Sequence, residues 1–166
     1  LLSLLLVAQR AARPPRTLLV RVPGTDSYRS ADATPDGLPE PGMVLYRFDG
    51  PLFFANADVF RDDVTEAVAI ADPPVRWVVL DMESIADTDS TATQMLVELL
   101  GDLAARGVTV AFARLKAPVA AYLDRAGIGA AADPGRVFLE VDDAVAAFRA
   151  LPTSAAPDGL ERSDPT

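Results

Sequence analysis

The fold is decided by WVVLDMESIADTDSTATQMLVELLGDLAARGVTVAFA, residues 77–113. Two nearly continuous apolar runs, Trp77–Leu80 and Val108–Ala113, bound this stretch, as is typical of strands that are covered on both faces. Between them, apolar residues recur at helical spacing over Ser90–Arg106, and Gly107 follows as a helix C-terminal cap. The helical stripe consists of Ala92, Met95, Leu96, Leu99, Leu100 and Leu103. Strand, helix and strand in this order predict two parallel strands joined by a right-handed crossover.

The same alternation continues toward the N-terminus. Met43–Phe48 predicts a strand, and Leu52–Ala55 predicts a second short strand after a turn at 49–51. Asn56 or Asp58 is expected to cap the helix that follows. That helix has an apolar face of Phe60, Val64, Ala67, Val68 and Ala71, and it ends at Asp72-Pro73-Pro74.

Toward the C-terminus the pattern predicts one more helix, a short strand and a last helix. Pro118 marks the start of a helix that runs to about Ala126, and Val137–Leu139 reads as a strand. Asp142 is expected to cap the last helix, whose inner face holds Val145, Phe148 and Leu151. The chain is therefore expected to be an α/β protein, with a mostly parallel sheet of about four to six strands and about four helices over 43–151.

The flanks of this core differ from it in composition. Residues 17–42 form a connection rich in proline and glycine that contains a short first strand, Thr17–Val22. Residues 152–166 hold Leu160 as their one large apolar side chain and are expected to be a disordered tail.

Residues 1–16 join an apolar run to a group of arginines. Leu1–Ala8 is apolar apart from Ser3, and Arg10, Arg13 and Arg16 follow it. As a helix this run would span only about 12 Å, which is less than the roughly 30 Å core of a bilayer. We interpret it as the remnant of a longer membrane helix with its basic flank, which places the rest of the chain in the cytoplasm. An amphipathic or disordered leader is the alternative.

Composition argues against most enzyme classes. The 166 residues include no cysteine and no histidine, which removes thiol nucleophiles, histidine bases and the usual transition-metal ligands. The formal net charge of −9 disfavours binding to nucleic acid, whose phosphates must be met by Lys and Arg. We therefore expect a protein that is not an enzyme and that uses no cofactor and no metal ion.

The densest polar cluster, residues 81–91, follows a predicted buried strand and opens the long helix. This position beyond the carboxyl end of a strand is the usual ligand site of an α/β sheet. Asp87 and Asp89 could cap the helix, or join neighbouring carboxylates in a Mg²⁺ or Ca²⁺ site, although the spacing is not that of an EF-hand. Ser90 and Thr91 lie in the first helical turn, where free N–H groups favour a phosphoryl group. Helix capping is the simpler interpretation of all four residues.

Three further segments carry weaker signals. The Asn56 side chain is a candidate ligand contact, but helix capping explains it more simply. Arg114 and Lys116 follow the strand Val108–Ala113 and could attract an anion or a nucleotide phosphate, while solvation of both is the plainer interpretation. Phe53 and Phe54 are expected to be core residues of the short strand.

Asp89-Ser90-Thr91-Ala92 at the start of a long amphipathic helix, followed by Gly107 and the strand Val108–Ala113, resembles the STAS domain. This fold is shared by bacterial anti-sigma-factor antagonists and the cytoplasmic tails of SulP-type anion transporters. Antagonists typically carry Asp-Ser-Ser/Thr-Gly here and are phosphorylated on the second hydroxyl residue, which the resemblance places at Thr91. Ala92 stands where those proteins have glycine.

A second stretch resembles the transporter branch specifically. Residues 24–29 and the run PGMVLYRFDGPLFFANA, residues 41–57, are similar to the SulP transporter tail that leads from the last membrane helix into the STAS domain. This resemblance covers about residues 13–151.

The resemblance to SulP transporters implies a regulatory and interaction domain at the cytoplasmic face of the plasma membrane, within a transporter of sulfate, bicarbonate or a similar anion. It implies the membrane domain of the same transporter as a partner, and a further protein or a nucleotide as candidate ligands. The alternative is a free-standing anti-sigma-factor antagonist that is controlled by phosphorylation at Thr91.

Overall fold

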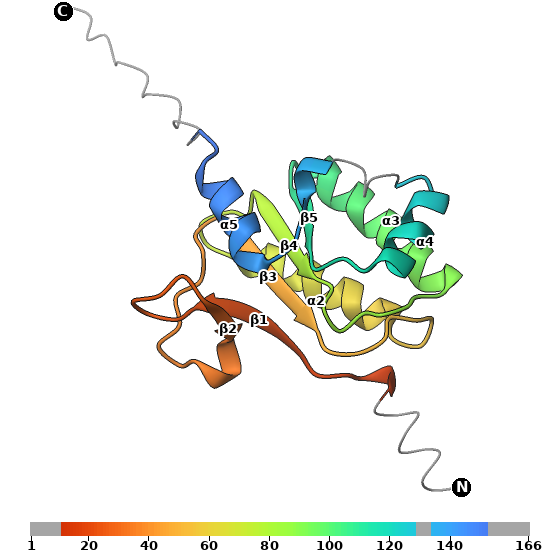
Figure 1. Cartoon of the computed structure of the whole chain (residues 1–166), viewed down its shortest axis with the longest axis horizontal. Helices are drawn as coiled ribbons and strands as arrows, with labels where there is room; N and C mark the ends of the chain where they lie inside the picture. The colour runs from red at the N-terminus through yellow and green to blue at the C-terminus, as the bar shows by residue number, and fades with distance from the viewer. Residues whose placement is uncertain (1–10, 129–133, 153–166) are drawn as a thin grey trace, which may run out of the picture.

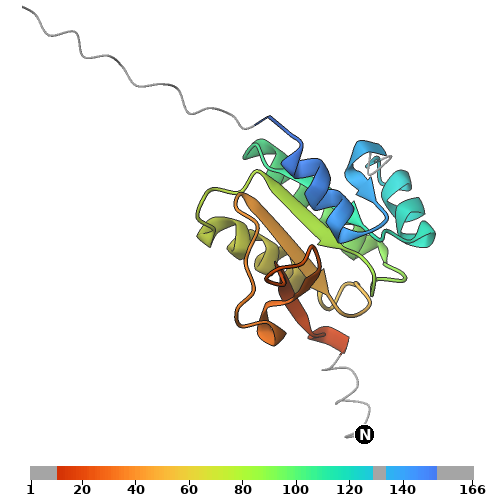
Figure 2. The ribbon, with the colours of Figure 1, turned by 60° about the vertical axis from the view of Figure 1, so that its left-hand side comes forward.

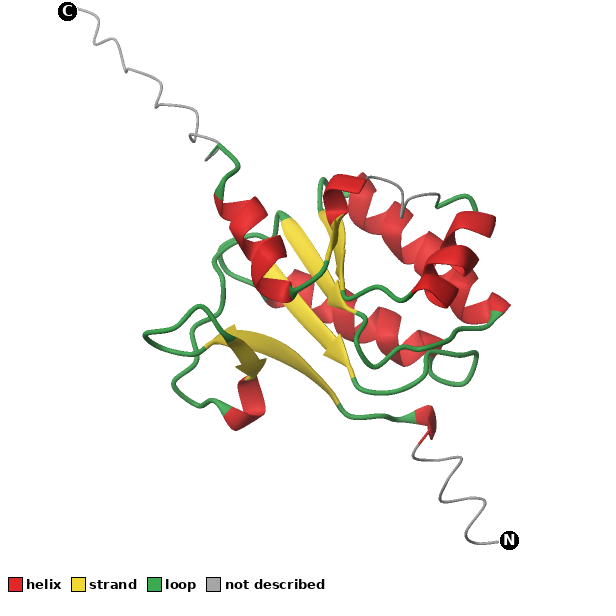
Figure 3. Ribbon diagram, in the orientation of Figure 1, coloured by secondary structure: helices red, strands yellow, loops and turns green. Residues whose placement is uncertain are grey.

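The computed structural model describes residues 11–128 and 134–152, and these form one sheet with helices on both faces (Figure 3). The strands are β1 (Arg16–Arg21), β2 (Tyr28–Ser30), β3 (Met43–Phe48), β4 (Trp77–Asp81), β5 (Thr109–Ala113) and β6 (Val137–Phe138). Their order across the sheet is β2-β1-β3-β4-β5-β6. β3 to β6 run parallel, whereas β1 is antiparallel to both of its neighbours. The predicted α/β architecture with a mostly parallel sheet is confirmed.

The helices follow from the order of the parallel strands. α2 (Ala57–Ile70), α3 (Ser90–Ala105) and α4 (Ala117–Arg125) connect β3, β4, β5 and β6 in turn. Because each right-handed crossover steps the same way across the sheet, all three helices cover one face. α5 (Val141–Arg149) covers the other face, in front of the sheet in Figures 1 and 2.

Two apolar cores result, one on each face of the sheet. The larger core packs Leu96, Leu99 and Leu103 of α3 against Phe48 and Phe112 of the sheet, and each of these side chains is at most 2% exposed. The smaller core places Phe148 of α5 against the opposite face with Leu19, Met43 and Leu45. The predicted inner faces of α3 and α5 are thus confirmed, except that Leu100 is only partly buried and Leu151 is 41% exposed. On α2, Val68 is only partly buried and Ala71 lies beyond the end of the helix.

The predicted strand at Leu52–Ala55 is wrong. Leu52 forms a single isolated bridge with Thr88, and the chain then turns into α2. The Asn56 side chain accepts a hydrogen bond from the Phe53 backbone N–H, so a local turn replaces strand pairing here. Phe54 is 67% exposed and Phe53 is only partly buried, so neither is the core residue that was expected.

The connection before β3 contains more structure than its composition predicts. β2 and a short 3-10 helix, η1 (Ala31–Ala33), lie within it, and Arg21 forms a bridge with Leu38. The sheet therefore begins at Arg16, ahead of the expected core. The expected cap of the last helix is also different, since α5 begins after Glu140 and Asp142 lies inside its first turn.

Two expectations lie outside the described residues. The apolar run Leu1–Ala8 is one, and the tail beyond Pro152 is the other. Among the described residues, no helix has the length and apolar character needed to cross a membrane.

Candidate functional site

Asp89 organises the N-terminus of α3. Its Oδ1 accepts a hydrogen bond from the Ala92 backbone N–H at 2.8 Å, which is the capping bond expected from the sequence. Its Oδ2 accepts a second bond, at 2.9 Å, from the backbone N–H of Phe54. One carboxylate therefore caps the helix and also holds the loop before α2 against it.

Ser90 and Thr91 are both exposed on the first turn of α3. Among the residues that the structure describes, neither hydroxyl has a hydrogen-bond partner. Both line a hollow of about 410 Å³ between the N-terminal halves of α2 and α3, which we call the α2–α3 groove. Its other lining residues are Phe54, Ala57, Asp58, Arg61, Gln94, Met95 and Glu98.

The charges of the α2–α3 groove are largely matched within the groove. Arg61 pairs with Asp58 at 2.9 Å and with Asp62 at 3.5 Å. Gln94 Nε2 donates to Glu98 at 3.0 Å. The helix dipole at Ser90 and Thr91 would favour an anion, but the Asp89 carboxylate already occupies the end of the helix. The groove thus offers accessible hydroxyls and an exposed aromatic ring rather than a ready-made anion site.

The acidic residues of this region do not converge. Asp87 is exposed, and its Oδ1 accepts from the neighbouring Thr88 backbone N–H at 2.8 Å. Asp81, the first acid of the predicted cluster, is buried and hydrogen-bonded to Arg47 and Arg114. Within the described residues no three acidic side chains come together in a way that could hold a metal ion.

Asn56 is fully buried, and its side chain is hydrogen-bonded by the protein itself. Besides accepting from Phe53, its Nδ2 donates to the backbone oxygens of Pro51 at 2.9 Å and Ala11 at 3.0 Å. Asn56 is the residue before α2, but its side chain forms no capping bond with the helix. It instead closes the loop beneath Phe54 and attaches the first described residue, Ala11, leaving no exposed surface for a ligand.

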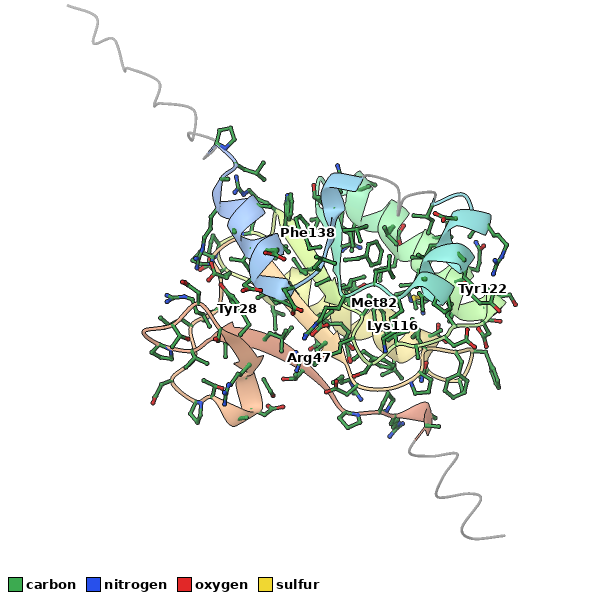
Figure 4. The ribbon with its side chains drawn as sticks, viewed as in Figure 1. Tyr28, Arg47, Met82, Lys116, Tyr122 and Phe138 are labelled. Carbon is green, nitrogen blue, oxygen red and sulfur yellow. The ribbon has the colours of Figure 1, made fainter. Side chains whose placement is uncertain are left out.

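Sequence reasoning missed a charge cluster around a buried carboxylate at the carboxyl ends of β3, β4 and β5. Asp81 is 2% exposed and accepts from Arg47 Nε at 2.7 Å. Arg114 meets the same carboxylate twice, with Nε 3.0 Å from Oδ1 and Nη2 2.5 Å from Oδ2. Glu83 adds an ion pair to Arg114 at 2.9 Å. Arg47, labelled in Figure 4, is the register partner of Asp81 across β3 and β4.

This cluster corrects the expectation that Arg114 is either solvated or free to bind an anion. Its φ of 57° lies in the left-handed region, which is uncommon for a residue with a side chain. Burial alone would lower the pKa of Arg114, but hydrogen bonding and the charges of Asp81, Glu83 and Glu140 outweigh it and raise that pKa. The guanidinium is therefore committed to partners inside the domain.

Arg114 and the α3 N-terminus also belong to different hollows. Arg114 and Arg47 line a polar hollow of about 200 Å³ with residues of β2 and α5, whereas Ser90 and Thr91 line the α2–α3 groove. Lys116 lies directly before α4 and lines neither of the two. The cluster could have been found from register, because Arg47 pairs with Asp81 across β3 and β4.

Comparisons with known proteins identify the family of the chain. The STAS domain family model matches residues 38–144. The probable sulfate transporter Rv1739c of Mycobacterium tuberculosis (strain H37Rv) is 36% identical over 148 residues, which cover 89% of the chain and 26% of that protein. The chain belongs to the STAS domain family. It spans about a quarter of the length of this relative.

Solved structures show the same fold. The murine anion transporter Slc26a9 superposes with a TM-score of 0.76 at 23% identity, over 89% of the chain and 24% of the transporter. The anti-sigma factor antagonist SpoIIAA in its unphosphorylated form superposes with a TM-score of 0.56 at 14% identity, over 70% of the chain and 96% of SpoIIAA. Both branches of the predicted resemblance therefore share this fold, as expected.

Proposed function

We propose that the chain is the regulatory and interaction STAS domain of a SulP-type transporter of sulfate, bicarbonate or a similar inorganic anion. In this proposal the domain lies at the cytoplasmic face of the plasma membrane and docks onto the membrane domain of the same protein. It has no catalytic role of its own. Binding of a nucleotide to this domain, which the family resemblance implies as a candidate, stays a prediction.

The reach of the sequence similarity is the observation that carries this proposal. Similarity to the M. tuberculosis sulfate transporter extends over 89% of the chain, well beyond the 38–144 core of the family model. A match that covers 89% of the chain must include β2 and at least the second half of β1, and β1 joins β2 to β3 in the sheet. The similarity in fold to Slc26a9 has the same extent.

Within this function, the α2–α3 groove is the proposed regulatory surface. Phe54 offers an exposed ring at its rim, and the hydroxyls of Ser90 and Thr91 are accessible. Asp89 connects this rim to the Phe54 loop, and Asn56 connects the loop to Ala11. A partner that displaces Phe54 would therefore act on the segment through which the chain approaches the sheet.

Transport by the complete protein tests the proposal. The complete gene would be expressed in a bacterial strain that lacks sulfate uptake, and uptake of radiolabelled sulfate and bicarbonate measured. We expect uptake of at least one of these anions, and a changed rate in Phe54→Ala. Leu139→Ala, at a side chain that is 84% exposed outside the groove, is the matched control. Absence of uptake of any inorganic anion would overturn the transporter assignment. Uptake by Phe54→Ala at the wild-type rate would show that the α2–α3 groove does not regulate transport.

The antagonist is the second candidate, and the exposure of Thr91 is the observation in its favour. As an antagonist the chain would accept a phosphoryl group on the Thr91 hydroxyl from a kinase and release an anti-sigma factor as a result. Mass spectrometry of the protein isolated from its native host tests this directly. Phosphate on Thr91, together with binding of the unphosphorylated chain to an anti-sigma factor, would favour this candidate over the transporter.

A further inference from the structure

A second concave surface lies beside β1, away from the α3 N-terminus. β1 pairs with β3 only over Arg16–Leu18, and over Leu19–Arg21 it pairs with β2 instead. The sheet therefore opens between the second half of β1 and the first half of β3. Two adjoining hollows of about 340 and 290 Å³ follow this opening, and we call them together the β1 groove. The two hollows share Leu18, Ala31, Ala67 and Ile70.

The β1 groove is apolar and incompletely covered. Leu18 is 39% exposed and Ile70, the last residue of α2, is 73% exposed. Val20, Val44 and Leu45 extend the apolar lining into the opening of the sheet. A concave apolar surface with large exposed side chains is the usual form of a binding site for a ligand or a partner.

The rim of the β1 groove is acidic. Asp32, Glu66 and Asp72 line it with exposed side chains, and none of them has an ion-pair partner among the described residues. Arg16 is the cation at this rim, and it is already paired with Asp63. The groove therefore presents an apolar floor inside a net negative border.

We propose that the β1 groove binds a cationic, apolar segment on the cytoplasmic face of the transporter's own membrane domain. This inference rests on the proposed function and names a docking surface within it. Leucine-like side chains of the segment would cover Leu18 and Ile70, and its lysines or arginines would face Asp32, Glu66 and Asp72. The rim charges select against an acidic peptide and against the surface of an anionic bilayer.

The chemistry of membrane domains makes such a segment available. Short cytoplasmic loops of membrane proteins carry an excess of lysine and arginine, and their ends are apolar where they enter the bilayer. The chain, with a net charge of −9, is attracted to this surface as a whole. We expect the specific contact between the acidic chain and a basic cytoplasmic loop to form in the β1 groove.

Peptide binding to the isolated chain tests the groove without reference to transport. The probe is a short peptide of alternating leucine and lysine, measured by calorimetry, with peptides in which glutamate replaces lysine or serine replaces leucine as comparisons. We expect binding by the first peptide alone, and weaker binding at high salt. Ile70→Gln and the double change Asp32→Asn with Glu66→Gln should each weaken binding about tenfold or more.

Matched controls separate the groove from general charge attraction. Leu139→Gln and Asp102→Asn change equally accessible side chains elsewhere and should leave binding unchanged. Equal loss in controls and groove variants, or equal binding of the glutamate peptide, would overturn the inference. Stronger binding of the chain to vesicles of phosphatidylserine than to the leucine–lysine peptide would overturn it in favour of a lipid surface.

Cross-linking in the complete protein tests the source of the segment. A photoreactive benzoylphenylalanine at position 70 should cross-link to a basic cytoplasmic loop of the membrane domain, and the same probe at position 139 should not. Cross-links from position 70 to any other site would overturn the inference even where anion uptake supports the transporter function. If the complete protein takes up no anion but the isolated chain binds the peptide, the transporter assignment is overturned, and the β1 groove remains a binding site for cationic peptides.

Discussion

At the scale of single residues, Asp81 shows how this domain uses charge. Its carboxylate lies at the end of β4 and is met from both neighbouring strands, by Arg47 of β3 and by Arg114 after β5. These contacts hold the carboxyl ends of three strands at one point. Arg114 keeps its left-handed backbone while its own N–H donates to Phe138 of β6. The cluster is a structural clamp at the sheet edge.

Asp81→Ala should destabilise the domain by about 3 kcal/mol or more, because it leaves two half-buried guanidinium groups without their shared anion. Urea unfolding at neutral pH measures this change. Glu83→Ala is the control, since its side chain is 54% exposed and an exposed ion pair contributes about 1 kcal/mol or less. A smaller loss in Asp81→Ala than in Glu83→Ala would contradict the clamp.

Tyr46 predicts a dependence of stability on alkaline pH. Burial, and then the neighbouring Asp63 carboxylate that its hydroxyl donates to, raise the pKa of Tyr46 above its ordinary value of about 10. The native state therefore keeps this proton at a pH at which the unfolded chain has lost it. The stabilising contribution is complete below about pH 10 and is lost as the pH rises further.

Tyr46→Phe should remove this part of the pH dependence, since phenylalanine has no proton to lose. Urea unfolding at pH 8 and pH 11 is the measurement. The wild type should lose more stability between the two pH values than the variant, with a limiting slope of about 1.4 kcal/mol per pH unit. Tyr28, whose pKa is raised by burial and by Glu40, remains in both proteins and cancels in the comparison. Equal losses would show that Tyr46 ionises alike in both states.

At the scale of elements, α3 is the helix on which the larger core is built. Leu99 lies in the middle of its apolar stripe and is 2% exposed. Leu99→Ala should therefore cost about 2–5 kcal/mol, the usual cost of deleting a buried leucine side chain. Urea unfolding measures it, with the partly buried Leu100→Ala as the weaker comparison on the same helix. A cost below about 0.5 kcal/mol would contradict the assigned face.

Two glycines are predicted to respond in opposite ways to alanine. A Cβ at Gly37 would collide with Val20 of β1 and lie 2.9 Å from the Thr34 carbonyl oxygen, so Gly37→Ala should destabilise the packing of the connection on β1. A Cβ at Gly101, inside α3, meets nothing within 4 Å. Gly101→Ala should stabilise by about 0.5–1 kcal/mol. Thermal melts of both variants test the pair, and the same sign in both would contradict it.

At the scale of the whole molecule, each face of the sheet is covered by an apolar core, and the surface carries two grooves. The larger core lies under α2, α3 and α4, and the α2–α3 groove opens at the outer surface of that layer. The β1 groove lies between β1, the first half of β3 and the C-terminal end of α2. The domain thus presents two concave surfaces, and each is lined partly by core residues, such as Met95 in the α2–α3 groove and Leu45 in the β1 groove.

Thr91→Asp should change the stability of the domain by less than about 1 kcal/mol. The helix dipole favours the new charge, the nearby Asp87 and Asp89 oppose it, and both effects are small at an exposed position. Urea unfolding measures stability, and anion uptake by the complete protein measures the function proposed above. Thr91→Ala is the matched neutral variant. A larger loss of stability in Thr91→Asp would show that the α3 N-terminus is packed more tightly than its exposure indicates.

Elements with a strong pattern were predictable from sequence. Three features depend only on residues that are near one another in the sequence. They are the apolar runs of β4 and β5, the apolar stripe of α3 and the capping residue Asp89. The exposed position of Ser90 and Thr91 follows from the same helical period. The family resemblance rests on these residues too, and the matched family model confirms it.

Tertiary structure alone decided the partners of individual side chains. Asn56 bonds to Ala11, 45 residues away, and so does not cap its own helix. Arg114 meets Asp81 because β4 and β5 lie side by side. The Arg114 guanidinium, which the sequence suggested was solvated or able to bind an anion, is therefore paired inside the domain. Leu52–Ala55 has the composition of a strand but no neighbouring strand to complete it. Local periodicity is a property of the sequence, whereas pairing across the sheet is a property of the fold, because it depends on which distant segments are brought together.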